Sequence, residues 1–494
     1  MQKFFKVTVG LIITLLTILI LLTYLPIYKK EDLHPIILPG AFMLKFFTGI
    51  LVIWIHEHVY RMDDFSHDGQ RFLREGEYLY HVFSVSASDY FKLLTGIGET
   101  PQLIQKYLHM TNYWSAGDLT LINDSKNVIR LHSLIHFFSG GNRLIHVSVF
   151  CFFSLIGLIA LHKSFARFIN MKKWHSFILL LIVPSTIFWS SSMMKEPFLF
   201  LGIGLFCFGL LGKTSRTIRI MSILTSLILL IGFKPYVLVC FLATLLFIAW
   251  YNTNKQRLAR SFFSFVLLIG IAAYLLPNMR SAVVHHLTRK QFDFINVGQG
   301  GLHVQADSTF YYFQPHQYKY LRITGNTAQL IQPTEALYYR VGSKESPEKV
   351  FLSPSEEKWP IVYFKPGCES YIEINRIDES AIQLIKNIPE ALFNTFFRPL
   401  PWDNGSELKY LAMVEVWLII GLIIFTLFNK RGLKPNEKPI AVGLVFFALS
   451  LFVLIGWTTP VIGAIARYRF PAQLAVIICC LLFIDTSKWK KNMW

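Results

Sequence analysis

The sequence predicts an all-α polytopic membrane protein with about eleven transmembrane helices and a small β-rich extracytoplasmic insertion. Two observations support this fold class. Hydrophobic residues make up 53% of the 494 residues and charged residues only 16%, and apolar runs recur along the chain at about the 20-residue length that crosses a bilayer. A disordered chain, a secreted disulfide scaffold and a coiled coil are excluded, because they need more charge, more cysteine or a heptad pattern.

Eleven apolar runs are the predicted spans. They cover residues 7–27, 36–57, 143–162, 175–193, 196–212, 217–233, 235–251, 261–277, 410–428, 439–458 and 469–485. The first run is longer than a signal-peptide core, and no small-residue cleavage site follows it, so we expect a retained span. The two runs that meet at Lys234 and Pro235 predict either a tight helical hairpin or one broken helix.

The positions of Lys and Arg indicate the orientation, because short basic loops stay preferentially in the cytoplasm. Every second loop is basic, as at Lys172 and Lys173 and again at Lys430 and Arg431. We therefore predict an inner (cytoplasmic) membrane protein with a cytoplasmic C-terminus, an outer N-terminus and two large extracytoplasmic loops. Basic loops and anionic lipids account for the net charge of +18, so we expect no nucleic-acid partner.

Three regions follow from this pattern. Residues 1–277 form an N-terminal transmembrane region that includes the extracytoplasmic loop 58–142, residues 278–408 an extracytoplasmic insertion, and residues 409–494 a C-terminal transmembrane region. Alternation of apolar and polar residues predicts strands in the insertion at 310–313, 318–323, 349–352, 361–364 and 371–374. The amphipathic stretch 380–397 predicts helix at the membrane interface.

Basic residues at the predicted outer face are the first candidate site residues. Lys195, Lys234, Arg467 and Arg469 lie at the outer ends of spans, and Arg398 follows the amphipathic stretch. Arg and Lys donate well to phosphate oxygens, so we predict that these residues bind a lipid phosphate. The structural alternative is that Lys195 pairs with Glu196 and that the arginines extend to lipid headgroups.

An acidic stretch after the second span supplies the second candidate set. Asp63, Asp64 and Asp68 are on the same predicted face as the cations, and an ionised carboxylate there could accept a proton from an acceptor hydroxyl. An ordinary solvated loop or a helix cap is the structural alternative. Asp64, Asp68 and His67 are also candidate ligands of a divalent cation such as Mg or Mn, although their spacing is no specific metal motif.

Residues 184–197 combine the end of a span, a hydroxyl-rich turn and a new span that begins at Lys195 and Glu196. Exposed hydroxyl and backbone N–H groups beside Lys195 would suit a sugar or a phosphate, whereas a capped hairpin is the structural alternative. The chain has neither a Walker loop nor a Gly-rich dinucleotide fingerprint. This excludes a nucleotide-binding site within the chain that would drive transport by ATP hydrolysis.

Together these segments resemble the GT-C superfamily of polyprenyl-phosphate-dependent membrane glycosyltransferases. The resemblance is in Asp63-Asp64, in PSTIFWSSSMMKE at 184–196, in FFRPLPW at 396–402 and in GWTTPVIGAIARYRFP at 456–471. It implies a catalytic Asp in the first large outer loop, best matched by Asp64 with Asp63 as the competing choice. It also implies that Lys195, Arg467 and Arg469 hold the phosphate of a lipid-linked sugar donor.

The activity implied by the resemblance is transfer of a hexose or pentose from a polyprenyl-phosphate donor to a hydroxyl of a glycan or lipid acceptor, in cell-envelope assembly. The outer N-terminus and the late second loop depart from the family. The late loop is more similar to O-antigen polymerases and ligases, which use lipid-linked substrates and rely on outer-face arginines, here including Arg398. A transporter of lipid-linked oligosaccharides and a structural envelope subunit are the non-enzymatic alternatives; Lys45 is the charge that lies within a predicted span.

Overall fold

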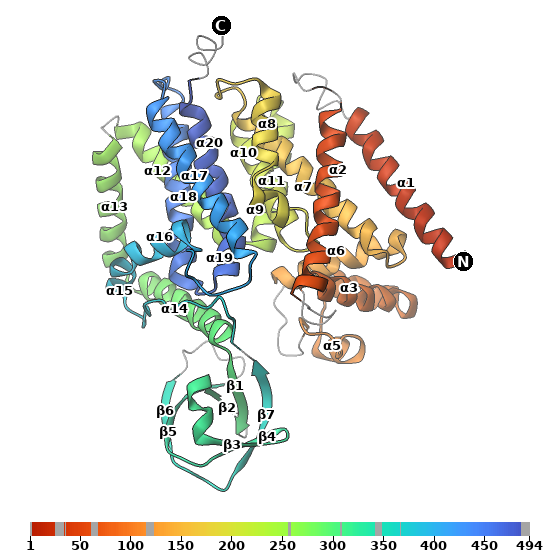
Figure 1. The fold of residues 1–494 in the computed structure, drawn as a ribbon, viewed down its shortest axis with the longest axis vertical. Helices are drawn as coiled ribbons and strands as arrows, with labels where there is room; N and C mark the ends of the chain where they lie inside the picture. The colour runs from red at the N-terminus through yellow and green to blue at the C-terminus, as the bar shows by residue number, and fades with distance from the viewer. Residues whose placement is uncertain are drawn as a thin grey trace. The chain divides into compact units, whose positions relative to one another are not determined.

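The computed structural model describes residues 2–24, 34, 36–60, 68–114, 123–254, 258–306, 309–340, 348–365 and 367–485. Most of these residues are helical, and the strands form one small antiparallel sheet (Figure 1). The chain forms two compact units. The first comprises Met1–Leu245, Leu422–Leu444 and Leu474–Trp494, and the second comprises Leu246–Gly421 and Val445–Gln473.

Eleven helices and one π-helical turn belong wholly to the first unit. They are α1 (Gln2–Tyr24), α2 (Ile37–Trp54), η2 (Ile55–Val59), α3 (Asp68–Val85), α4 (Ala87–Thr95), α5 (Pro101–Tyr107), α6 (Asp124–Ser139), α7 (Arg143–Phe165), α8 (Lys173–Leu181), α9 (Pro184–Trp189), α10 (Glu196–Leu211) and α11 (Arg216–Phe233). Four helices contribute residues to both units, namely α12 (Pro235–Asn254), α17 (Lys409–Phe428), α18 (Lys438–Thr458) and α20 (Phe470–Phe483).

Six of the described helices are long and apolar enough to cross a membrane: Ile37–Val59, Arg143–Phe165, Arg216–Phe233, Pro235–Thr253, Lys409–Phe428 and Lys438–Thr458. The number rises to eight if each of two bent pairs is one span. These pairs are Arg260–Leu275 with Pro277–Gln299, bent by 102°, and Ile462–Tyr468 with Phe470–Phe483, bent by 51°. All six helices coincide with predicted runs, and the total of about eleven stays a prediction.

Two predicted segments differ from the structure. The run 175–193 is not one helix, because α8 ends at Leu181 and the short α9 begins at Pro184, where the residue before proline is disfavoured in a helix. The run 261–277 ends as α13 (Leu258–Leu275), and α14 (Pro277–Gln299) follows. The insertion therefore begins with a helix, ahead of the first predicted strand at 310–313.

Small residues allow the closest helix packing in the first unit. A Cβ on Gly204 of α10 would lie 2.0 Å from the carbonyl oxygen of Gly157 on α7, and a Cβ on Gly157 would lie 2.7 Å from the Cα of Leu201. Such backbone approach is typical of helix contacts inside membranes, where apolar side chains gain little by leaving lipid for one another. The α7–α10 crossing fixes the beginning of α10, which follows directly on Lys195.

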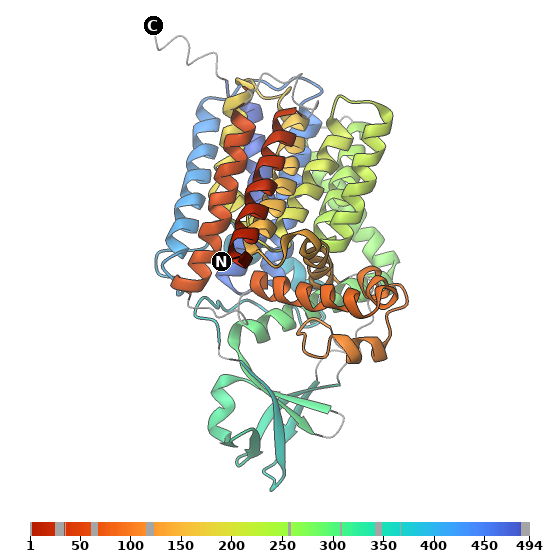
Figure 2. The ribbon, with the colours of Figure 1, turned by 90° about the vertical axis from the view of Figure 1, so that its right-hand side faces the viewer.

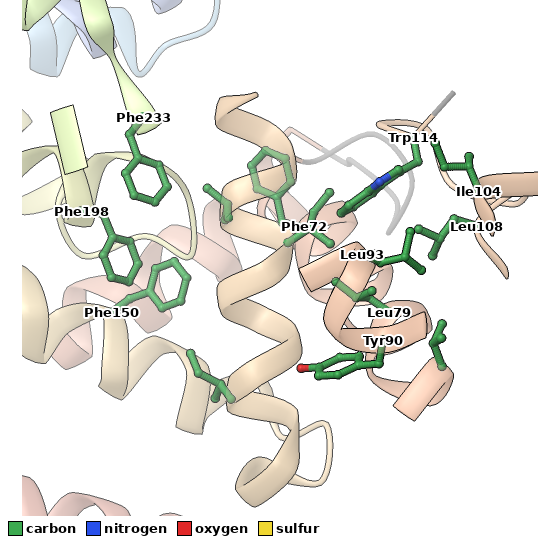
Figure 3. Packing of buried hydrophobic residues seen from close by; sticks show 14 of the residues in the cluster. Phe72, Leu79, Tyr90, Leu93, Ile104, Leu108, Trp114, Phe150, Phe198 and Phe233 are labelled. Atoms are coloured by element: carbon green, nitrogen blue, oxygen red, sulfur yellow. The ribbon is translucent and has the colours of Figure 1, made fainter. Parts of the chain in front are cut away.

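A second core forms where the segment α3–α6 packs on α7, α10 and α11 (Figure 3). Phe198 stacks on Phe233 at a ring-centroid distance of 5.4 Å and meets Phe150 edge-on at 4.9 Å. Phe72, Leu79, Leu93 and Trp114 continue this core on the side of α3. Phe198 comes three residues after Lys195 and Phe233 comes directly before Lys234, so this packing places both lysines.

The second unit contains a seven-stranded antiparallel sheet with strand order β3-β4-β7-β1-β2-β5-β6. The strands are β1 (Gly301–Ala306), β2 (Thr309–Phe313), β3 (Leu321–Thr324), β4 (Thr327–Leu330), β5 (Thr334–Arg340), β6 (Glu348–Leu352) and β7 (Lys358–Lys365). The 3-10 helix η3 (Pro315–Tyr320) leads into β3, and Figure 2 shows it beside the twisted strands. One face of the sheet is apolar and includes Leu302, Val304, Phe313 and Trp359, as expected for alternating strands.

The predicted strands near 310–313, 349–352 and 361–364 are confirmed. Residues 318–323 divide between η3 and β3. The prediction at 371–374 is wrong, because Tyr371 makes only an isolated bridge with Val461. A strand forms only where a neighbouring strand pairs with it. Alternation of apolar and polar residues over four positions does not show whether such a neighbour is present.

Three further helices of the second unit are α15 (Ala381–Lys386), α16 (Ile388–Phe397) and α19 (Ile462–Tyr468). The predicted amphipathic stretch is thus two helices joined at Asn387. A Cβ on Gly456 of α18 would lie 2.2 Å from the carbonyl oxygen of Ala391, so this glycine permits the close contact of α16 with α18. The large apolar side chains of Ile382 and Ile385 are exposed, and the position of this stretch at the membrane interface stays a prediction.

Candidate functional site

The structure brings Lys195 and Lys234 together around a residue that the sequence did not single out, Asp124. The Lys195 Nζ lies 2.9 Å from Asp124 Oδ1, and the Lys234 Nζ lies 3.4 Å from Asp124 Oδ2. Lys195 also donates to the Ser125 hydroxyl at 2.9 Å. We call Asp124, Ser125, Lys195 and Lys234 the Asp124 cluster. Its three charged residues come from α6, from the turn before α10 and from the junction of α11 with α12.

Local sequence explains why Asp124 is held at this point. Asn123 caps α6, and its side-chain oxygen accepts from the backbone N–H groups of Ser125 at 3.0 Å and Lys126 at 3.2 Å, as an N-cap Asn does. Asp124 therefore occupies the first helical position. The Asn127 amide donates to the Gly232 carbonyl at 2.9 Å, which fixes the end of α11 and hence Lys234 beside α6.

Within the Asp124 cluster itself, two ammonium groups share one carboxylate, so the four residues together carry an excess positive charge. Burial would raise the pKa of Asp124, but the charges of Lys234 and Lys195 and the hydrogen bonds from both outweigh burial and hold the pKa below its usual value. The carboxylate therefore stays ionised at neutral pH. The helix N-terminus adds further positive potential. The cluster can attract an anion while keeping a proton-accepting carboxylate.

Exposure distinguishes the members of the cluster. The side chain of Asp124 is 36% exposed, whereas those of Lys195 and Lys234 are 12% and 9% exposed. Lys195 lies over Phe72, with its Nζ 5.5 Å from the ring centroid, and Lys234 lies 5.9 Å from the ring centroid of Tyr236. The lysines thus support the carboxylate from the protein side, and the carboxylate is the group that faces outward.

A second carboxylate also bridges two cations next to the beginning of α6. Glu99 accepts from Lys126 at 2.9 Å, from Arg130 at 3.3 Å and from the Trp114 indole N–H at 3.0 Å. We call Glu99, Trp114, Lys126 and Arg130 the Glu99 cluster. It is almost completely buried. Because its charged groups are buried and hydrogen-bonded to one another inside the protein, this cluster fixes α6 rather than offering a binding surface.

The hydroxyl-rich turn differs from the prediction that its hydroxyls are exposed. Ser190, Ser191 and Ser192 are all buried, and so is Thr186. Ser190 accepts a hydrogen bond from Lys45 of α2 at 2.6 Å. The turn is therefore a buried segment of the protein that leads to Lys195. Lys195 forms an ion pair with Asp124 at 2.9 Å, and its pairing with the adjacent Glu196 stays an alternative.

The predicted arginines lie in the second unit. Arg469, between α19 and α20, is buried and donates to the backbone carbonyls of Thr395 at 3.0 Å and of Arg398. The Arg398 side chain donates to Asn394 at 2.9 Å and pairs with Asp403. Arg467 lies on α19, with its guanidinium carbon 6.0 Å from the ring centroid of Tyr468. Arg398 and Arg469 are thus neighbours, and the interactions of Arg469 brace the end of α16.

The predicted catalytic residues Asp63 and Asp64, together with His67, lie outside the described residues. Asp68 is the first residue of α3 and accepts a hydrogen bond from the Tyr113 hydroxyl at 3.2 Å. Within the described ranges, no three His, Cys, Asp or Glu side chains are grouped so that they could hold a metal ion. The involvement of Asp64 or His67 in metal binding stays a prediction.

Sequence reasoning missed Asp124 although a signal was present. Asn123 and Asp124 precede a helical stretch, which is typical of a helix N-terminus, but a cap signal does not reveal partners 71 or 110 residues further along the chain. Comparisons with family models, curated proteins and solved structures found no match to this chain. The fold defines a mostly helical chain with several candidate membrane spans.

Proposed function

We propose that this protein is a membrane glycosyltransferase that moves a sugar from a polyprenyl-phosphate-linked donor to an acceptor hydroxyl, with the Asp124 cluster at its reaction centre. The observation that carries this proposal is one outward-facing carboxylate whose two oxygens each meet a different lysine. Glycosyl transfer from an anionic donor makes use of both signs of charge. The donor places negative charge beside the cations, and the acceptor hydroxyl must lose a proton.

In the proposed reaction, the acceptor hydroxyl oxygen attacks the anomeric carbon of the donor sugar. The bond between that carbon and the phosphate oxygen breaks, and its electron pair leaves with the polyprenyl phosphate. Asp124 accepts the proton of the attacking hydroxyl, which a carboxylate kept ionised by neighbouring cations can do at neutral pH. Lys195 and Lys234 stabilise the negative charge that develops on the leaving phosphate.

The same proposal includes the location of these residues relative to the membrane. The apolar helices hold the polyprenyl chain, and the Asp124 cluster lies on the extracytoplasmic face of the inner membrane, opposite the basic loops. About eleven spans and a cytoplasmic C-terminus belong to the same proposal. Asp124 takes the base role in the loop 58–142, the predicted location of the catalytic Asp, while Asp64 and Asp63 remain the competing candidates. Arg398, Arg467 and Arg469 remain candidates for holding the donor phosphate.

The test is sugar transfer by the full-length protein in nanodiscs, using a panel of polyprenyl-phosphate hexoses and pentoses. Asp124→Asn keeps the size of the side chain but removes the base, and should lower the transfer rate by about 10²- to 10⁴-fold. Lys195→Gln and Lys234→Gln should each raise the donor concentration needed for half-maximal rate by about tenfold or more, because a charge-assisted hydrogen bond is lost.

Asp89→Asn is the matched control, since Asp89 also pairs with a lysine, Lys92, at 3.3 Å in the same region of the chain. It should transfer sugar at the wild-type rate. Full activity of Asp124→Asn would remove Asp124 from the base role, and the parallel Asp64→Asn and Asp63→Asn variants would then decide between the remaining carboxylates. Dependence on Arg398 with no dependence on any of these aspartates would favour the polymerase or ligase alternative.

A further inference from the structure

The turn that carries Lys195 contacts the surrounding helices through Ser190, Ser191, Met193 and Lys195. Lys45 of α2 donates to the Ser190 hydroxyl at 2.6 Å, and the thiol of Cys151 on α7 lies 3.6 Å from the Ser191 carbonyl oxygen. His132 of α6 lies 3.3 Å from the Met193 carbonyl oxygen. Two residues later, Lys195 meets Asp124 at the beginning of the same helix. Helix α6 therefore contacts this turn twice, through His132 and through Asp124.

His132 belongs to a chain of buried hydrogen bonds. Its Nδ1 lies 2.8 Å from the Nδ1 of His146, and the Nε2 of His146 lies 2.8 Å from the Ser139 hydroxyl. The backbone N–H of Gly141 donates to that hydroxyl at 3.3 Å. His132, Ser139 and His146 are all buried. An unsatisfied polar group at this depth would be costly, so each contact in the chain needs one donor and one acceptor.

The direction of the chain follows from its last acceptor. The Met193 carbonyl can only accept, so the proton of a neutral His132 is on Nε2 and its Nδ1 must accept from His146. His146 then carries its proton on Nδ1, and its Nε2 accepts from the Ser139 hydroxyl. Every link is satisfied while both rings are neutral. The sequence of donors runs from Gly141 through Ser139, His146 and His132 to the carbonyl of Met193.

Packing around His132 leaves little freedom for this arrangement. Its ring stacks on Phe150 at a centroid distance of 4.7 Å. On the other side, a Cβ on Gly76 of α3 would lie 2.5 Å from the Cβ of His132, so α3 presses directly on α6 here. Two titratable groups lie close to His132, namely His136 on its own helix and His146 on α7. Burial, with a smaller contribution from His136, lowers the pKa of His132 to about 3.

We propose that His132 is a positioning residue for Lys195: the hydrogen-bond chain from Ser139 through His146 to His132 holds the Met193 carbonyl, and with it the turn that keeps the Lys195 ammonium on Asp124. The catalytic importance of this positioning rests on the proposed function. The position of Lys195 itself can be measured without an assay of sugar transfer. While His132 and His146 are neutral, their hydrogen bonds hold Lys195 in the same position at pH 5 and at pH 8. Neither ring donates a proton to the reaction.

Two variants of His132 separate positioning from ring protonation. His132→Gln keeps one donor and one acceptor but cannot be protonated at neutral pH, whereas His132→Phe keeps a stacking ring and loses both hydrogen bonds. The readout is the acetylation rate of Lys195 by an N-hydroxysuccinimide ester in the full-length protein in nanodiscs, followed by peptide mass spectrometry. Lys234 is the internal reference, because it reaches Asp124 from the junction of α11 with α12 and not from the turn that His132 contacts.

His132→Phe should raise the Lys195 labelling rate by about fivefold or more, as expected when a buried hydrogen bond is lost, with Lys234 unchanged. His132→Gln should label like the wild type at pH 7 and pH 8. A folded His132→Phe variant with the wild-type Lys195 rate would overturn the proposal, and so would His132→Gln behaving like His132→Phe.

If His132→Phe does not fold, Ser139→Ala takes its place. It removes only the far end of the chain, and we expect about a twofold faster reaction of Lys195; an unchanged rate would overturn the proposal. Asp124→Asn is the positive control, since it should increase labelling of both lysines. Full sugar transfer by Asp124→Asn, together with faster Lys195 labelling in His132→Phe, would refute the proposed function and leave the positioning role intact.

Discussion

The Glu99 cluster and the Asp124 cluster have the same composition of charge, one carboxylate shared by two cations, but they differ in exposure. Glu99 and its partners Lys126 and Arg130 have side-chain exposures of 3%, 0% and 8%, whereas the Asp124 side chain is 36% exposed. A buried group of charges loses hydration and must be matched within the protein. A partly exposed group keeps solvent contact and can exchange it for a substrate. Burial, rather than the type of residue, therefore separates the structural cluster from the candidate site.

The largest expected effect is at Glu99. Glu99→Gln leaves Lys126 and Arg130 buried without their shared negative charge, and should lower the free energy of unfolding by about 3–5 kcal/mol. Thermal unfolding in detergent, followed by tryptophan fluorescence, measures this loss. Glu57→Gln is the control, because the pair of Glu57 with Arg143 is much more exposed and should contribute less than about 1 kcal/mol. Equal destabilisation by the two variants would contradict the distinction between buried and exposed clusters.

The next effect compares one lysine from each cluster. Lys126→Met should destabilise the protein by about 2 kcal/mol, because Glu99 keeps Arg130 and Trp114 but loses a buried charge-assisted hydrogen bond at 2.9 Å. Lys195→Met should cost about 1 kcal/mol or less, since Asp124 keeps Lys234 and contact with water. The same unfolding assay measures both. A larger loss for Lys195→Met would indicate that the Asp124 cluster is mainly structural.

Part of this arrangement can be predicted from the sequence because it depends on local signals. The length and apolarity of a run are enough to predict α2, α7, α11 and α18, and the charges of Lys195 and Lys234 at the outer ends of spans indicate two members of the Asp124 cluster. Their convergence on Asp124 cannot be predicted in this way. It depends on the stacking of Phe198 with Phe233 and on the seating of α6, which are contacts between distant parts of the chain that no local periodicity records.

The sequence-based predictions that differ from the structure also have physical explanations. The broken segment at α8 and α9 contains Pro184, but a proline inside an apolar run is compatible with either a kinked span or two helices, and the surrounding packing decides. The isolated bridge at Tyr371 shows that alternation needs a partner strand before it becomes a sheet. The burial of Ser190 and Ser191 could not be inferred from hydroxyl content, because their burial depends on Lys45 and α7 approaching the turn from other segments.

The smallest expected effect on stability, at Asp124 itself, makes the sharpest distinction between the clusters. Asp124→Asn should lower the free energy of unfolding at pH 7 by about 1 kcal/mol or less, because the ion pairs are partly hydrated. The pKa of Asp124 is held below its usual value in the folded state. Its ionised form therefore adds stability above about pH 3.9, the unfolded value, and this contribution is lost as the pH falls through the lower, folded value.

The difference between wild type and Asp124→Asn should accordingly be constant from pH 5 to pH 8 and vanish well below about pH 3.9. It should also shrink between 0.15 M and 1 M NaCl, where the Debye length falls from about 8 Å to 3 Å, whereas the effect of Glu99→Gln should hardly change because its partners are shielded from salt. If both variants respond equally to salt, the Asp124 carboxylate is not accessible to solvent ions. An acceptor hydroxyl could then not reach it, and the base role would pass to Asp64 or Asp63.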